Sequence, residues 1–287
     1  MRDRSSAPTG LTRRSRRLSD LETEQRMLRA AVAMIHRDGL TVSLDHISFE
    51  DVIRDADVSR SAVYRRWPYK DLFFSDLVKE LAKDATPTIV DDEVALMRQV
   101  LGEHLDWFET LELRHSLVVE LIRQLALLDF QTIYGSPGWR TYLALHATVA
   151  GLAPGKLRDQ VQEALAQSEQ TRTARIAASW EQLTGLFGYR LRPELGVSFE
   201  TMATMLSATM RGLVITALST PGIATHRVQA SPFGAASKDE WCLAAIGMAS
   251  IASAFLEPDP GIEWDDERVT NVQQALRSWT APPAEEP

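Results

Sequence analysis

The sequence lacks several features that mark secreted, membrane and zinc-binding proteins. Among 287 residues there is one cysteine, Cys242, which excludes an internal disulfide and a cysteine-ligated zinc site. The longest weakly polar stretch, Cys242 to Leu256, is shorter than the roughly 18 apolar residues that a membrane span needs. Met1 to Asp20 has no apolar signal-peptide core. We therefore expect a cytoplasmic protein with no membrane association and an inert, buried thiol.

Catalytic and metal-binding motifs are also missing from the sequence. It contains no G-x-S-x-G, no glycine-rich phosphate loop, no H-E-x-x-H and no carboxylates clustered at catalytic spacing. His104, His115 and His146 do not form a metal-ligand spacing. We expect neither an enzyme nor a protein with a cofactor or a metal.

Positive charge is concentrated at one end of an acidic chain. The net charge is −8, but residues 1–84 hold 16 Lys and Arg against 14 Asp and Glu, which leaves 15 against 25 in the rest. A weakly basic head on an acidic body suits binding to a few phosphates at one place. Arg13 to Arg17 form a basic, flexible arm within residues 1–19. This arm either reaches DNA or is a solvated tail, and the sequence favours neither.

Four helices are predicted between this arm and a domain boundary at Thr86 and Pro87. They run from Leu21 to a stop at Gly39, from the N-cap Ser48 to about Ala56, from Arg60 to Trp67, and from Lys70 to Leu81. Asp20 or Ser19 caps the first helix, and Ser59 caps the third. Asp57 is one of the few non-glycine residues that tolerates the positive φ of a sharp turn.

The third helix has two contrasting faces. Val63 and Trp67 lie one turn apart and are expected to face inward, which leaves a basic and aromatic outer face. Two short helices joined by a sharp turn are what major-groove reading needs. A three-helix packing unit without a DNA role is the alternative interpretation of this segment.

Individual side chains of this outer face suit contacts with double-stranded DNA. Arg60 can donate two hydrogen bonds to guanine, Ser61 can contact either kind of base edge, and Ala62 can meet a thymine methyl group. Tyr64, Arg65 and Lys70 are expected to hold phosphates. If four to six phosphates are neutralised per monomer, the log–log salt slope is about −4 to −5.

The segment Ala56 to Phe73, ADVSRSAVYRRWPYKDLF, resembles the signature of the TetR (tetracycline repressor) family of transcriptional regulators. The residues that fit the signature in register are Val58, Ser59, Val63, Tyr64, Trp67, Lys70 and Leu72. The resemblance covers roughly residues 21–81. It implies base-reading roles for Arg60, Ser61 and Ala62, and phosphate contacts for Ser48, Ser59, Tyr64 and Lys70. Two departures are Asp57 in place of the usual turn glycine and a longer stretch between Gly39 and Ser48.

The rest of the chain is predicted to be helical, which makes the fold class all-α. Candidate helices cover 91–111, 114–133, 140–151, 156–187, 198–218 and 238–256, with a further short helix over 267–279. The expected domains are the arm (1–19), a helix-turn-helix DNA-binding domain (20–85), a ligand-binding and dimerisation domain (86–257) and a Pro-rich tail (258–287).

Two of these helices are candidates for a homodimer interface. Ser198–Leu218 and Lys238–Leu256 are apolar nearly all round, with small residues that let backbones approach closely. The resemblance implies that such last helices pair with their two-fold mates and that the earlier helices enclose a ligand cavity. Burial inside a monomer is the alternative explanation for their composition.

A pocket for a small-molecule effector is expected in the body. The candidate ligand-binding residues are aromatic, or are polar residues within apolar runs: Trp107, Leu111, Glu120, Arg123, Gln124, Trp139, Tyr142 and Trp180. Glu120 and Arg123 stand three residues apart, so mutual pairing is the simpler explanation for both.

These patterns together indicate a ligand-responsive transcriptional repressor, released from a pseudo-palindromic operator by a small molecule that shifts a population of conformations. A dimeric helical adaptor that does not bind DNA is the alternative, and an enzyme is a third. The effector, the operator, the regulated genes and the sign of regulation are not encoded in any motif.

Overall fold

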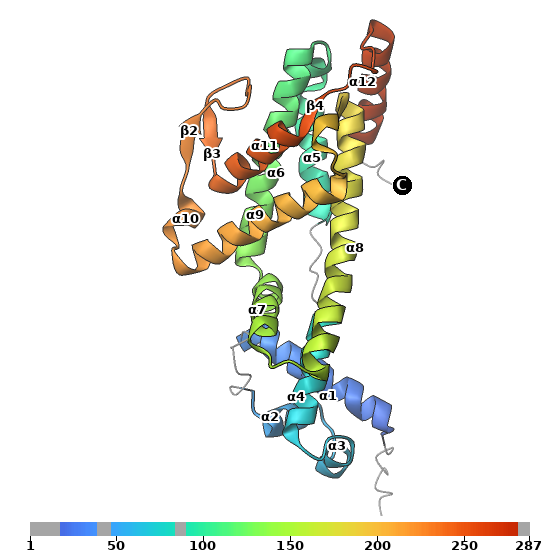
Figure 1. Ribbon diagram of the computed structural model, residues 1–287, viewed down its shortest axis with the longest axis vertical. Helices are drawn as coiled ribbons and strands as arrows, with labels where there is room; N and C mark the ends of the chain where they lie inside the picture. Colours follow the sequence, from blue (N-terminus) through green and yellow to red (C-terminus); the bar gives the residue numbers. More distant parts are fainter. Residues whose placement is uncertain (1–17, 39–46, 84–89, 281–287) are drawn as a thin grey trace, which may run out of the picture.

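The computed structural model describes residues 18–38, 47–83 and 90–280, which form an elongated and almost wholly helical molecule (Figure 1). The all-α class is as predicted. Residues 18–38 and 47–83 form a small head at one end, and residues 90–280 form a larger body. Arg13–Arg17, the stop at Gly39 and the boundary at Thr86 and Pro87 lie outside the described residues.

The head contains four helices: α1 (Asp20–Asp38), α2 (Phe49–Asp55), α3 (Arg60–Arg66) and α4 (Lys70–Lys83). Between the two candidate caps of α1, Ser19 holds the position, because its Oγ accepts from the Glu22 N–H at 3.1 Å and Glu22 Oε2 accepts from the Ser19 N–H at 2.8 Å. This reciprocal capping box satisfies donors that a helix start otherwise leaves free.

Apolar side chains from all four helices form the core of the head. Val63 and Trp67 have no exposed surface, as predicted. The Phe73 ring meets the Trp67 ring edge-on at 5.1 Å and the Phe49 ring at 5.1 Å. The indole N–H of Trp67 donates to Asp76 Oδ2 at 3.0 Å, so this polar group of the core is satisfied. Aromatic packing therefore fixes α3 against α2 and α4.

The body is built from longer helices. They are α5 (Val90–Glu103), α6 (Leu111–Gly135), α7 (Pro137–Gly151), α8 (Lys156–Phe187), α9 (Phe199–Ser219), α10 (Gly222–Thr225), α11 (Leu243–Phe255) and α12 (Asp266–Thr280), with short 3₁₀ turns η1 (Leu105–Phe108) and η2 (Pro193–Leu195). The predicted helix over 156–187 matches α8 in both bounds. The one predicted over 91–111 is interrupted after Glu103 and continues as η1.

Two small antiparallel ribbons depart from the predicted absence of strands. β1 (Tyr189–Leu191) pairs with β4 (Leu256–Pro258), and β2 (Val228–Ala230) pairs with β3 (Asp239–Trp241). The predicted helix Lys238–Leu256 is therefore wrong at both ends, because its first residues form β3 and Leu256 begins β4. Cys242 is buried between β3 and α11, and its Sγ accepts from the Ala245 N–H at 3.4 Å as the cap of α11.

Helix α8 connects the two ends of the molecule. Its C-terminal part packs against α9 in the body, while α8 also contacts α4, and α7 contacts α1 and α4 (Figure 1). The head thus touches the helices that continue into the body.

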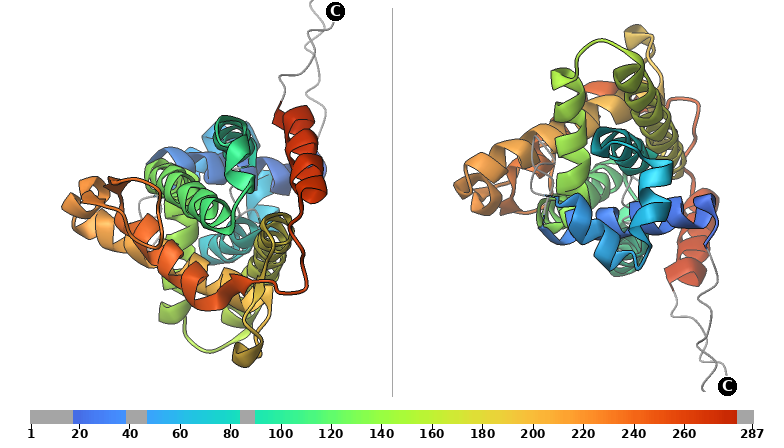
Figure 2. Two further views of the ribbon diagram at one scale, coloured as in Figure 1. Left: turned by 90° about the horizontal axis from the view of Figure 1, so that it is seen from above. Right: turned by 90° about the horizontal axis from the view of Figure 1, so that it is seen from below.

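Figure 2 shows α10 and the β2–β3 ribbon projecting from one side of the body, with α12 on the opposite side. Within the segment predicted as a Pro-rich tail, α12 packs against α5 and η1.

Helix α9 is long and apolar enough to cross a membrane by length and composition alone. It packs against α6, α8 and α11, and its buried residues include Met202, Leu206 and Met210. Core helices of globular proteins pass the same test, so this composition is weak evidence for a membrane span.

Candidate functional site

The helix pair α2–α3 has the geometry that the sequence predicts. Ser48 Oγ accepts from the Asp51 N–H at 3.3 Å, and Ser59 Oγ accepts from the Ala62 N–H at 3.3 Å, so each hydroxyl caps its helix. Between the helices, Asp57 has φ +52°, the left-handed conformation that usually calls for glycine. The aspartate therefore substitutes for the turn glycine without losing the turn.

One face of this helix pair is exposed. Of the predicted DNA-contacting residues, Ala62 is half-buried and the others are exposed: Ser48, Ser59, Arg60, Ser61, Tyr64, Arg65 and Lys70. Tyr69, which the sequence analysis did not single out, is 73% exposed beside Lys70. Buried Val63 and Trp67 hold the opposite side of α3. A rigid helix therefore presents its basic and aromatic side to solvent.

Glu50 of α2 contacts two of these exposed side chains. The Tyr64 hydroxyl donates to Glu50 Oε1 at 3.1 Å, and Arg60 Nη2 lies 2.8 Å from Glu50 Oε2. The hydrogen bond to Glu50 raises the pKa of Tyr64 above its ordinary value, with smaller contributions from burial and from the Glu50 charge. Tyr64 is therefore protonated at neutral pH. Glu50 therefore engages the polar ends of both side chains.

Two further arginines of α3 pair with carboxylates of the head. Arg65 pairs with Asp20, and Arg66 Nε donates to Glu24 Oε2 at 3.0 Å. The hydrogen bond to Glu24 outweighs burial and raises the pKa of Arg66. Burial pushes the pKa of Asp76 up, but hydrogen bonds from Trp67 and Lys79 leave it below its ordinary value. These contacts hold the C-terminal end of α3 against α1 and α4. They also pair both arginines with carboxylates of the head itself.

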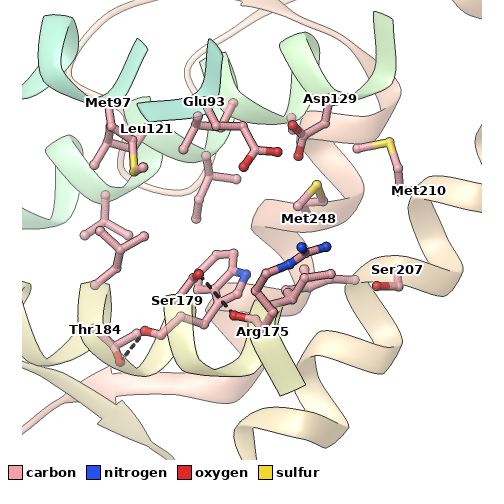
Figure 3. A pocket seen from close by; sticks show the side chains of 18 of the residues that line it. Glu93, Met97, Leu121, Asp129, Arg175, Ser179, Thr184, Ser207, Met210 and Met248 are labelled. Carbon is pink, nitrogen blue, oxygen red and sulfur yellow. Dashed lines mark hydrogen bonds between the residues drawn. The ribbon is translucent and has the colours of Figure 1, made fainter. Parts of the chain in front are cut away.

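A cavity of about 370 Å³ lies inside the body, between α5, α6, α8, α9 and α11. Its size is within the range of small-molecule sites. Most of its lining is apolar and includes Met97, Leu121, Met210 and Met248 (Figure 3). Two of the predicted ligand-binding residues, Trp139 and Trp180, line it. Their role in ligand binding stays a prediction.

The other six predicted ligand-binding residues lie elsewhere and do not line this cavity: Trp107, Leu111, Glu120, Arg123, Gln124 and Tyr142. The ring of Trp107 lies tilted against that of His104 with centroids 4.1 Å apart, and Leu111 is 43% exposed at the start of α6. Tyr142 is buried and its hydroxyl accepts from Arg211 Nη1 at 3.4 Å. Helix direction, which the sequence pattern does not give, turns these side chains away from the cavity.

The polar residues that interrupt the apolar run of α6 satisfy one another. Arg123 Nε donates to Glu120 Oε2 at 2.8 Å, and Gln124 Nε2 donates to Glu120 Oε1 at 2.6 Å. Arg123 Nη1 also donates to the carbonyl oxygen of Glu240 at 3.2 Å. The mutual pairing considered from the sequence is therefore present. The network attaches β3 to α6.

A pair of carboxyl groups that the sequence analysis missed faces the cavity. Glu93 of α5 and Asp129 of α6 lie side by side on one wall, and Arg175 of α8 points toward them from the opposite wall (Figure 3). Burial, reinforced by neighbouring Glu93, holds the pKa of Asp129 well above its usual range. Burial also raises the pKa of Glu93, while the hydrogen bond from Asp129 and the charge of Arg175 oppose that rise. Ionisation of both carboxyl groups at once is therefore unfavourable in this site.

A second charged cluster joins α7, α8 and α9 beside the cavity. Glu169 Oε2 accepts from Arg172 Nη2 at 2.9 Å and from Arg211 Nη2 at 2.7 Å. Burial lowers the pKa of Arg211, with Arg172 adding to the effect. Burial and the same two arginines lower the pKa of His146, whose Nε2 is 3.8 Å from Glu169 Oε1. His146 is therefore neutral at pH 7, and one carboxylate pairs with one buried and one half-buried guanidinium group.

One face of α9 is apolar and uncovered. Met205 is 47% exposed and Ile215 is 53% exposed. Ala208 and Gly212 lie between them, at alternating spacings of three and four residues, and are also exposed. This spacing puts the four residues in one stripe along the helix. Near it, α11 approaches closely at Gly247, where an added Cβ would lie 2.8 Å from Thr209 Cγ2.

No family model matches this chain, and no curated protein matches it. Solved structures with a similar fold include a protein from Mesorhizobium loti described as a TetR-family transcriptional regulator. It has 15% identity, covers 83% of this chain and 98% of its own, and has a TM-score of 0.46. TylP, a TetR regulator from Streptomyces fradiae, has 14% identity, covers 90% of this chain and 92% of its own, and has a TM-score of 0.37.

The complex of SmeT with triclosan has 17% identity, covers 85% of this chain and 95% of its own, and has a TM-score of 0.41. Two of these three structures carry the name of the family that the Ala56–Phe73 signature resembles. Likeness at this distance concerns the helical fold and assigns no function.

Proposed function

We propose that the protein is a cytoplasmic, homodimeric DNA-binding transcriptional repressor that a small molecule releases from a pseudo-palindromic operator. The observation that carries this proposal is the exposed face of α3, where Arg60, Ser61, Tyr64 and Arg65 project from a helix held rigid by buried Val63 and Trp67. The major groove admits one such helix, and its first residues reach base edges. The N-caps Ser48 and Ser59 place hydroxyls where phosphates can be held.

The uncovered stripe of α9 supports pairing with a second copy of the chain. Met205 and Ile215 supply apolar area, and Ala208 and Gly212 between them let a partner backbone approach closely. A two-fold axis through this stripe makes the same residues face one another in both copies. The resulting dimer presents two recognition helices, which accounts for an operator with two related half-sites.

The contacts between head and body supply a route for release. Helix α8 lines the cavity and also contacts α4, while α7 contacts α1 and α4. A ligand that binds better to one arrangement of α7 and α8 shifts the population toward it and changes the orientation of the head. Only differential affinity for the two arrangements is needed. The two recognition helices then no longer match successive major grooves.

Fluorescence anisotropy with the DNA upstream of the protein's own gene tests the DNA-binding part of this proposal. We expect Arg60→Ala to weaken binding about tenfold or more and to relax preference at one base position, as for loss of a base contact. We expect Tyr64→Phe to weaken binding to all sequences alike, because it removes only the hydroxyl. The matched control is Arg192→Ala, which removes the same charge from a half-buried arginine next to β1 in the body. Equal, sequence-independent affinity for wild type and all variants contradicts the proposal.

A dimeric adaptor that does not bind DNA is the second candidate, and the Glu50 contacts favour it. Glu50 holds both Arg60 and Tyr64, Asp20 holds Arg65, and Asp57 adds a negative charge at the turn. If these carboxylates cannot be displaced, the face is closed to phosphates. Retained dimerisation in analytical ultracentrifugation, together with no DNA binding at low salt, is the result that favours the adaptor.

A further inference from the structure

We propose that the cavity of the body takes a lipophilic cation and that the Glu93–Asp129 pair selects its charge. This inference deepens the proposed function, because it names the chemical class of the effector and rests on the cavity being the effector site. It starts from the two carboxyl groups on one wall of an otherwise apolar space (Figure 3).

Asp129 is the observation that points to a ligand. Its side chain lies deep in the body at the cavity wall, and its Oδ1 has no hydrogen-bond partner and almost no exposed surface. The carboxyl group of Asp129 also shares a hydrogen bond with that of Glu93. A buried oxygen without a partner costs on the order of 1–3 kcal/mol, so such atoms are uncommon in folded proteins. An acceptor at the wall of an apolar cavity is suited to a polar group that enters the cavity.

The carboxyl pair does not serve the packing of α5 against α6. Apolar residues of similar volume hold such a contact as well or better, because they need no desolvation of charge. The described residues place no cation within ion-pair distance of Glu93 or Asp129. The nearest charge that acts on Glu93 is Arg175, which is exposed at the cavity and therefore screened by water. The negative charge of the pair is left for a ligand.

The other charged groups at the cavity are Arg172 on α8 and Arg211 on α9, and both are already engaged. Arg172 donates to Glu169 and Ser207, and Arg211 donates to Glu169, to Tyr142 and to the Ser207 carbonyl oxygen. Helices α7 and α11 contribute only neutral side chains to the lining, Trp139 and Met248, and the Tyr189 hydroxyl of β1 is neutral because burial raises its pKa to about 12. This cluster has one excess positive charge, so an anionic ligand is the competing class that an experiment must separate.

The apolar lining favours a cation as well. Three thioethers from three helices face the cavity, those of Met97, Met210 and Met248 (Figure 3). Thioethers are polarisable and adapt to irregular ligands. Trp180 adds an indole, whose ring face attracts cations more strongly when water is excluded. The cavity therefore offers apolar surface for the apolar part of the ligand and two carboxyl groups for its positive charge.

A cation at the pair changes the protonation of Asp129. Burial and the neighbouring Glu93 raise the pKa of Asp129, because it is unfavourable for two adjacent carboxyl groups in an apolar site both to ionise. A positive charge beside them stabilises the second carboxylate. Binding a permanent cation therefore releases a proton from the protein to the buffer.

Two ions of matched size and shape but opposite charge test the inference: tetraphenylphosphonium and tetraphenylborate. Neither carries an exchangeable proton. Isothermal titration of the full chain in sodium phosphate at pH 7 compares their affinities. Repeating the phosphonium titration in Tris, whose ionisation enthalpy differs, counts the protons released. We expect phosphonium to bind at least about tenfold more tightly than borate, as for one charge contact in a partly buried site. We also expect a fraction of a proton, up to one, to be released.

The variants separate the two carboxyl groups. Glu93→Gln is expected to weaken phosphonium binding about tenfold, because it removes the carboxylate. Asp129→Asn is expected to abolish proton release while changing affinity less, because Glu93 remains. Glu181→Gln is the matched control, since it removes the same charge from an exposed position of α8. Circular dichroism melting of each variant verifies that the fold is intact.

Each result decides the inference. Preference for phosphonium that is lost in Glu93→Gln and kept in Glu181→Gln supports it. Equal or tighter binding of borate overturns it in favour of the arginine cluster, and Glu93→Gln behaving like Glu181→Gln overturns it as well. No binding of either ion also overturns it. If phosphonium binds as expected but leaves DNA affinity unchanged, the ligand class stands and the release step of the proposed function fails.

Discussion

The arginine–glutamate ion pairs of the head are exposed to solvent, whereas those of the body are largely buried. On the head, the Arg60 side chain is 75% exposed and its partner Glu50 is 45% exposed. In the body, the Arg172 side chain is 7% exposed and its partner Glu169 is 23% exposed. Exposed pairs contribute little to stability and exchange partners easily, whereas buried pairs cannot lose one member without leaving a desolvated charge. The head is therefore suited to exchanging carboxylates for phosphates, and the body is suited to holding its helices in place.

Removing Glu169 tests the buried side of this comparison and is expected to have the largest effect. In Glu169→Ala, Arg172 and Arg211 lie side by side with no carboxylate between them. We expect the free energy of unfolding to fall by about 3–5 kcal/mol, as for a broken buried ion pair. Urea unfolding followed by circular dichroism measures it, with Glu181→Ala on the exposed side of α8 as the control. A loss below about 1 kcal/mol would show that the cluster is not desolvated.

Neutralising Asp129 tests the cavity and is expected to stabilise the protein. The folded state raises the pKa of Asp129, so its contribution to stability is fully present below the unfolded-state value of about 4 and is lost as the pH rises through the raised pKa. Asp129→Asn cannot lose this contribution. We expect a gain on the order of 1 kcal/mol at pH 7 and a flatter dependence of stability on pH above 4.

Urea unfolding of wild type and Asp129→Asn across this pH range measures the difference between them. An equal slope in both proteins would mean that Asp129 is an ordinary carboxylate. Asp159→Asn, at an exposed position of α8, is the control for a general change of charge.

Removing the cap of α3 tests how firmly the recognition helix is held. Ser59→Ala deletes the hydroxyl that accepts from the Ala62 N–H, and we expect a loss of about 1 kcal/mol. Ser61→Ala makes the same chemical change two residues later, where no capping bond exists. If both variants unfold at the same urea concentration, the cap does not stabilise α3.

The head was largely predictable because its signals are local in sequence. The two N-cap serines, the turn at Asp57 and the inward Val63 and Trp67 follow from residue types at short spacing. The Glu50 contacts were not predictable, because they depend on how α2 and α3 cross. Fourteen residues separate Glu50 from Tyr64, and no periodicity joins them.

The body was predictable as helices but not as a site. Glu93 and Asp129 stand on different helices and meet only through the packing of α5 and α6. The one local signal was an aspartate within the apolar run from Leu125 to Phe130, which has the same form as the Glu120 signal. Glu120 proved to be paired on its own helix, and Asp129 proved to face the cavity. Composition alone cannot separate these two cases.

Neutralising Glu50 tests the exposed side of the comparison and is expected to change stability least. Glu50→Gln keeps the size of the side chain and removes its charge, so the free energy of unfolding should change by no more than about 0.5 kcal/mol, as for an exposed ion pair. Urea unfolding measures this, beside the exposed Asp55→Asn of the same helix as control. A loss comparable to that of Glu169→Ala would remove the contrast between head and body.

The same variant shows whether the carboxylates of the head compete with DNA. With Glu50 neutral, Arg60 and Tyr64 lose their internal anionic partner, and fewer charge contacts must be broken when phosphates arrive. We expect Glu50→Gln to bind non-operator DNA a few fold more tightly at low salt and Asp55→Asn to gain less, because Asp55 touches neither group. Such a result would mean that Glu50 competes with phosphates for Arg60 and Tyr64 and so weakens binding to non-operator DNA. Operator DNA makes more contacts and would displace Glu50. Unchanged or weaker binding would mean that Glu50 orients Arg60 for base reading instead of competing with the duplex.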